Sequence, residues 1–71
     1  MTDSIALREV ERRIQVVEDN LRQLQEQATA LSGAADEERV ANRIADQEAK
    51  LAALLKQREA LIANARSDAQ E

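Results

Sequence analysis

The fold is decided by residues 31–40, which read LSGAADEERV and hold the only glycine of the chain. Gly33 stands where the C-terminus of a helix favours a residue with positive φ. Asp36 and the two glutamates after it place carboxylates near the positive N-terminal end of a following helix. The stretch therefore predicts a helix over about residues 4–31, a turn over about 32–36, a second helix over about 37–66 and a frayed C-terminal tail.

Apolar residues on both sides of this stretch recur with the alternating steps of three and four that mark a coiled-coil seam. The first seam runs through Leu7, Val10, Ile14, Val17, Leu21, Leu24, Ala28 and Leu31. The second runs through Val40, Ile44, Gln47, Leu51, Leu54, Arg58, Leu61 and Ala65. Extending the first seam past Leu31 would turn Val40 and Ile44 away from the stripe. The heptad register therefore breaks between Leu31 and Val40, which favours two helices.

A turn this short makes the two helices antiparallel neighbours. Folding back at the turn places Ile14 near Leu54, for example. The predicted fold is all-α, with a single domain over residues 1–71 that forms an antiparallel two-helix hairpin with coiled-coil-like packing. The alternative is one continuous helix that tolerates Gly33 at a cost of about 1 kcal/mol.

A lone hairpin cannot enclose its seams, because each helix covers only one side of the other. Leu55 and Ile62 also widen the second seam on one flank, beyond what a two-stranded contact requires. We therefore expect a homo-oligomer, most simply a two-fold dimer that forms a four-helix bundle. Gly33 is the expected turn residue, and the expected core and interface residues are Leu7, Val10, Ile14, Val17, Leu21, Leu24, Leu31, Val40, Ile44, Leu51, Leu54, Leu55, Leu61 and Ile62.

Four further residues each allow two interpretations. Gln47 and Arg58 interrupt the second seam, either with their polar ends in water at its edge or as polar core residues that specify register and oligomeric state. Ile5 and Val16 lie off the first seam on one side of that helix. They either mark a further contact or are scattered exposed aliphatics.

The composition excludes most kinds of chemistry. The 71 residues include no cysteine, histidine or aromatic residue, so the commonest nucleophile, general base and zinc ligands are missing. We expect no catalytic residue, no metal site and no cofactor, and hence no enzyme. The net charge of −4 comes from 14 acidic and 10 basic residues spread along the chain. Since no apolar run is long enough to span a membrane and the first residues are polar and unbasic, we expect a cytoplasmic protein.

The remaining function class is protein association, in which a small helical adaptor, scaffold or regulator binds itself and another protein. An RNA-binding regulator that uses Arg8, Arg12 and Arg22 is an alternative, although the acidic net charge and the lack of aromatics argue against nucleic acid. A third alternative comes from residues 31–33, Leu-Ser-Gly, which resemble the Trp-x-Gly or Leu-x-Gly turn of small type VII secretion substrates. That resemblance implies an export-linked helical hairpin.

Overall fold

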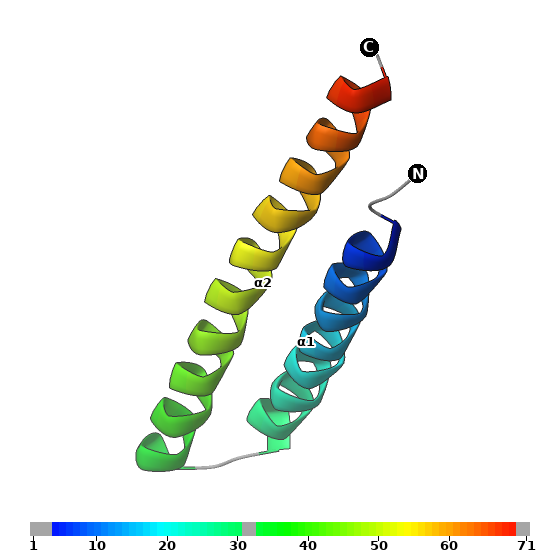
Figure 1. Ribbon diagram of the computed structural model, residues 1–71. Helices are drawn as coiled ribbons and strands as arrows, with labels where there is room; N and C mark the ends of the chain where they lie inside the picture. Colours follow the sequence, from blue (N-terminus) through cyan, green and yellow to red (C-terminus); the bar gives the residue numbers. More distant parts are fainter. Residues whose placement is uncertain (1–3, 31–32, 70–71) are drawn as a thin grey trace.

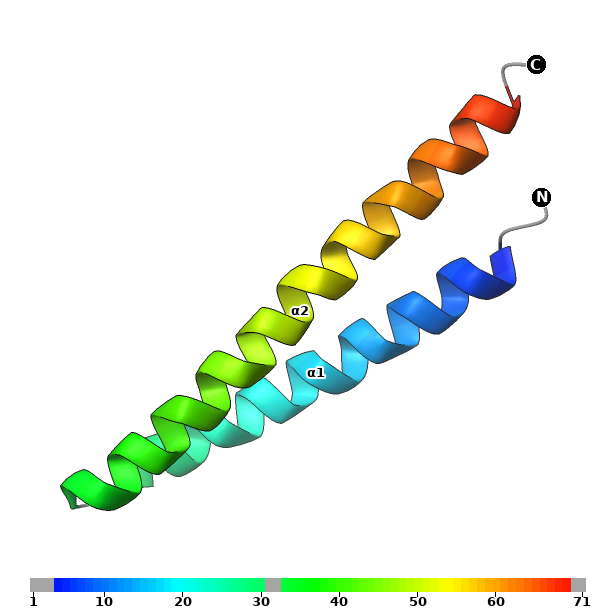
Figure 2. The same ribbon diagram turned by 60° about the vertical axis from the view of Figure 1, so that its left-hand side comes forward.

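The chain folds into two α-helices that pack against each other along their length. The computed structural model describes residues 4–30 and 33–69, with the side chains of residues 5–30 and 33–66. Helix α1 spans Ser4–Ala30 and helix α2 spans Ala34–Ala69, and the two run antiparallel (Figures 1 and 2). Since the described residues contain helices and no strand, the predicted all-α hairpin is confirmed. Leu31 and Ser32, which carry a predicted core position and most of the type VII resemblance, lie outside the described residues.

The turn is shorter than predicted, because α2 begins at Ala34 and residues 34–36 belong to the helix. Gly33 has φ of 123°, and its carbonyl oxygen accepts a hydrogen bond of 3.0 Å from the backbone N–H of Glu37. The predicted positive φ at Gly33 is thus confirmed, and the residue also occupies the cap position before α2. Asp36 and Glu37 lie in the first turn of α2, where carboxylates stabilise the helix N-terminus.

The second helix also ends later than predicted, since it continues to Ala69 where a frayed tail was expected after about residue 66. Residues 67–69 read SDA and contain neither glycine nor proline, so nothing in them interrupts the helix. Arg66 stands in the last turn, where a cation interacts favourably with the helix dipole. With 36 residues against 27, α2 runs past the beginning of α1 (Figure 1).

The two seams meet between the helices, but they are buried to different degrees. On α1, the side chains of Val10, Ile14, Val17 and Leu21 are only 5–9% exposed. On α2, only Val40 is buried. Ala65 at the end of this seam is exposed, and the seam residues between them are half-buried, namely Ile44, Gln47, Leu51, Leu54, Arg58 and Leu61. Because α1 covers one side of a wider apolar arc, the second seam remains partly open to water.

Apolar contact alone joins the two helices in the part of the chain that is described. The one ion pair there links Arg22 and Asp19 within α1, with 3.5 Å between Nη2 and Oδ1. The one side-chain hydrogen bond there is also local, from the hydroxyl of Thr29 to the carbonyl oxygen of Glu26 at 2.7 Å. The position of α2 on α1 therefore depends on how the aliphatic side chains interlock.

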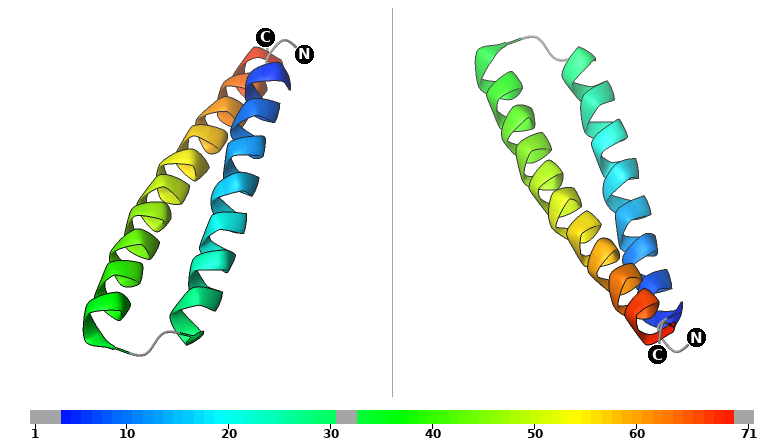
Figure 3. Two further views of the ribbon diagram at one scale, coloured as in Figure 1. Left: turned by 90° about the horizontal axis from the view of Figure 1, so that it is seen from below. Right: turned by 90° about the horizontal axis from the view of Figure 1, so that it is seen from above.

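The hairpin is elongated and exposes more surface than a compact protein of its mass. Its principal extents are 58 × 14 × 12 Å and its radius of gyration is 16.5 Å, whereas a compact domain of this length would have about 11 Å. Its accessible surface is 5716 Å², against about 4,400 Å² for a compact monomer of this mass. The views agree that the end of α1 and the beginning of α2 lie at one end of the hairpin, and that the beginning of α1 and the end of α2 lie toward the other (Figure 3).

Candidate interaction surface

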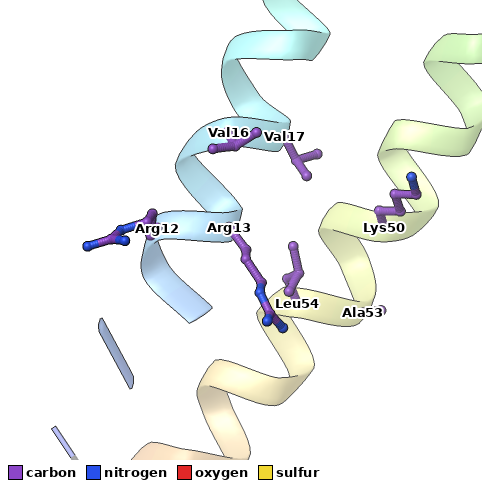
Figure 4. Close-up of a pocket in the computed structure, with 7 residues that line it drawn as sticks. All are labelled: Arg12, Arg13, Val16, Val17, Lys50, Ala53 and Leu54. Atoms are coloured by element: carbon purple, nitrogen blue, oxygen red, sulfur yellow. The ribbon is translucent and has the colours of Figure 1, made fainter. Parts of the chain in front are cut away.

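An open groove of about 460 Å³ lies across the middle of the hairpin, on one flank of the seam. Helix α1 contributes Arg12, Arg13, Val16 and Val17, and α2 contributes Lys50, Ala53 and Leu54 (Figure 4). We call these seven residues the basic groove. Val17 and Leu54 point toward each other at its base, and the Arg13 side chain extends from α1 toward Leu54 (Figure 4).

The basic groove has an apolar wall, and three of the side chains that line it end in a positive charge. Its wall exposes only apolar atoms, since the arginine and lysine side chains contribute methylenes and hold their charges further out. Val16 is 52% exposed, although it is β-branched and apolar. Among the described residues, none of the three cations forms an ion pair, because the only pair there is Arg22–Asp19. The groove therefore offers unpaired positive charge beside uncovered aliphatic surface.

A smaller hollow of about 180 Å³ lies on the same flank, nearer the turn. Its lining is mostly amide side chains, from Asn20, Gln23, Gln27 and Gln47, together with Leu24. Gln47 is half-buried, as is Arg58 further along α2. Neither side chain forms a hydrogen bond or ion pair with another described residue, and no buried side-chain polar atom among these residues lacks a partner. The structure therefore favours the interpretation in which both polar ends reach water at the edge of the seam.

The two flanks of the hairpin carry opposite charges next to the seam. In heptad notation, residues just before an a position lie on one flank and residues just after a d position lie on the other. Along both seams the charged residues of the first kind are Arg13, Arg43 and Lys50, and those of the second kind are Glu11, Glu18 and Glu48. All six are exposed. The basic flank is the one that carries the basic groove.

The acidic flank has its own apolar feature on α2. Leu55 is half-buried and Ile62 is 40% exposed, and both directly follow d positions of the second seam. Glu59 lies four residues after Leu55 and three before Ile62, so it shares their face of the helix, and Glu48 lies one heptad before Leu55. We call Glu48, Leu55, Glu59 and Ile62 the acidic ridge.

The arginines considered for RNA binding are all exposed but do not form one cationic surface. Arg12 lines the basic groove. Arg22 contacts Asp19, and Arg8 occupies the same heptad position as Arg22, toward the acidic flank. Lys50, which comes from the other helix, was not among the residues predicted from sequence. In the sequence, basic residues come just before a positions and acidic residues just after d positions, and this separation is the signal that would have indicated Lys50.

Other kinds of site are not found in the described part of the chain. No three histidine, cysteine, aspartate or glutamate side chains there are grouped so that they could hold a metal ion. None of the helices in these residues is long and apolar enough to cross a membrane. No protein-family model matches the chain, and no curated protein or solved structure matches it either. The hairpin's own surfaces are therefore the only guide to its function.

Proposed function

We propose that this protein is a non-enzymatic protein–protein interaction module, a small homo-oligomeric helical hairpin that acts as an adaptor, scaffold or regulator. The observation that carries the proposal is the unequal burial of the seams. Ile14 on α1 is 5% exposed, while Leu51, Leu54 and Leu61 on α2 are only half-buried. Half-exposed leucines along one helix lose hydrophobic stabilisation that a further chain would supply, at about 25 cal/mol per Å² of apolar surface covered.

The surface area supports self-association as the first step. The chain exposes about 1,300 Å² more than a compact monomer of its mass would, and a standard protein interface covers about 800 Å² on each partner. Two hairpins that stack as a four-helix bundle form the smallest assembly in which this area is covered. The cytoplasm is the compartment that we propose, since a dispersed acidic charge favours solubility there.

The test is the solution mass by sedimentation equilibrium over a wide concentration range, with far-ultraviolet circular dichroism at the same concentrations. We expect a helical species at a multiple of the 7.9 kDa chain mass, with helix content falling on dilution as the assembly dissociates. A stable helical monomer at all concentrations would overturn self-association. In that case the half-buried face of α2 would belong to a different protein.

An RNA-binding regulator is the second candidate, and one observation favours it. Arg12, Arg13 and Lys50 gather at one groove, where they would attract phosphate. Against it are the net charge of −4 and the absence of aromatic side chains for base stacking. Retention on a heparin matrix separates the two candidates. An RNA-binding protein would be held strongly and released steeply by salt as counterions exchange, whereas the association module would pass through.

A further inference from the structure

We propose that the basic groove of one copy receives the acidic ridge of a second copy, so that the hairpins associate back to front. This inference rests on the proposed self-association and specifies which surfaces meet. The groove carries Arg12, Arg13 and Lys50 around an apolar wall. The ridge carries Glu48 and Glu59 beside Leu55 and Ile62. The two surfaces lie on opposite flanks of the same hairpin.

The charged residues directly beside the seam oppose an arrangement in which like flanks meet. Stacking two acidic flanks would bring Glu11, Glu18 and Glu48 of one copy against the same residues of the other. Stacking two basic flanks would do the same with Arg13, Arg43 and Lys50. Like charges brought together at an interface cost several kcal/mol. Back-to-front stacking instead sets the basic flank of one copy against the acidic flank of the next.

The apolar parts of the two surfaces are complementary in the same arrangement. Val16 at the groove is 52% exposed and Ile62 on the ridge is 40% exposed, and they belong to opposite flanks. The open groove of about 460 Å³ has room for aliphatic side chains, and the ridge presents two of them two helical turns apart. Covering both surfaces removes exposed aliphatic groups from water while the carboxylates lie beside the cations.

The exposed area allows a second, smaller contact patch on each copy beside one of standard size. The excess over a compact monomer is about 1,300 Å², which is more than the single patch of about 800 Å² that one standard interface uses. A contact between two different patches is heterologous, so an open assembly keeps a free groove at one end and a free ridge at the other until a ring closes. Two copies still place four helices together, but the assembly grows beyond two as concentration rises.

Charge reversal tests the proposal with exposed residues that the fold does not need. One variant reverses the ridge (Glu48→Lys with Glu59→Lys), and a second reverses the groove (Arg13→Glu with Lys50→Glu). We expect each variant alone to self-associate about tenfold or more weakly than the wild type, because groove and ridge then have the same sign. Mixing the two variants restores complementary surfaces, so the mixture regains the mass and helix content of the wild type. Matched controls are Glu26→Lys and Lys56→Glu on the outer faces of the helices, which leave association unchanged.

Sedimentation equilibrium and circular dichroism of the separate and mixed variants read out the result. Recovery in the mixture also shows that both variant chains are able to fold. If either variant alone keeps the wild-type mass, the contact joins like surfaces and the inference is wrong. Loss of association in both variants without recovery on mixing also overturns it. A monomeric wild type would instead remove the self-association on which the inference rests, so failure of the two proposals is distinguishable.

Discussion

The backbone N–H of Glu37 donates a 3.0 Å hydrogen bond to the carbonyl oxygen of Gly33, and this bond closes the first turn of α2. Gly33 accepts it while its φ is 123°, a value that residues with a side chain rarely adopt. A Cβ built on Gly33 meets no atom within 4 Å. Any penalty for a larger residue at this position is therefore backbone strain, with no contribution from a steric clash.

We predict that Gly33→Ala lowers the free energy of unfolding by about 1–2 kcal/mol, because alanine is strained at this φ. In a continuous helix the same change would raise stability by about 1 kcal/mol, so the sign separates the hairpin from the single-helix alternative. Urea titration followed by circular dichroism measures it. The control is Ala45→Gly at an exposed position inside α2, which measures the cost of a glycine within a helix. A stabilising Gly33→Ala would show that the chain does not turn at Gly33.

A second prediction compares one substitution at two depths on the same helix. Ile14 is 5% exposed and Ile5 is 71% exposed. We expect Ile14→Ala to cost about 2–5 kcal/mol, because it removes buried methylenes and leaves a cavity between the helices. Ile5→Ala, its matched control, should change stability by less than about 0.5 kcal/mol. Thermal unfolding monitored by circular dichroism gives both values, and equal losses at the two sites would contradict the seam described above.

Arg58 provides a third prediction, because it is a half-buried cation on the apolar seam of α2. Arg58→Leu should raise the melting temperature, by about 4–8 °C for each kcal/mol gained, because it replaces a charged side chain at the edge of the seam with an aliphatic one. Lys56→Leu at an exposed position on the same helix is the control for added hydrophobicity. A sharp fall in melting temperature for Arg58→Leu would mean that the guanidinium has a specific partner in the assembly.

The fourth prediction concerns the link between folding and assembly. The described hairpin has five buried apolar side chains and none less than 2% exposed, which is a small core for a chain that must offset its conformational entropy alone. The melting temperature should therefore rise with protein concentration, as mass action requires when folding and association are coupled. Melting curves from micromolar to millimolar chain concentration test this. A midpoint that is independent of concentration would indicate a self-sufficient monomer.

The fold was largely predictable from sequence, because the spacing of apolar residues repeats over several heptads. Each apolar position then supports the assignment of the next one. The break in register before Val40 predicted two helices, and the described residues form two. The start of α2 was placed too late. Gly33 can either close one helix or cap the next, and sequence alone does not distinguish these roles. The late end of α2 was missed for a related reason, since residues 67–69 carry no signal that stops a helix.

The candidate surface was harder to predict than the fold. A seam depends on the spacing of residues within one helix, whereas the basic groove joins Arg13 of α1 to Lys50 of α2. Their proximity depends on the register between the helices, which sequence fixes only to about one turn. The sequence identifies Val16 as an apolar residue off the seam, but only the structure shows that cations from both helices line the same groove.

The described residues contain no polar link between the helices, and this limits the range of temperature over which the hairpin is stable. Apolar contact weakens on cooling, because the hydration of apolar groups becomes less unfavourable and unfolding has a large positive heat capacity change. Hydrogen bonds or ion pairs between α1 and α2 would reduce this loss of stability on cooling. None joins the described residues of the two helices. The hairpin should therefore loosen in the cold as well as in the heat, with its greatest stability at an intermediate temperature.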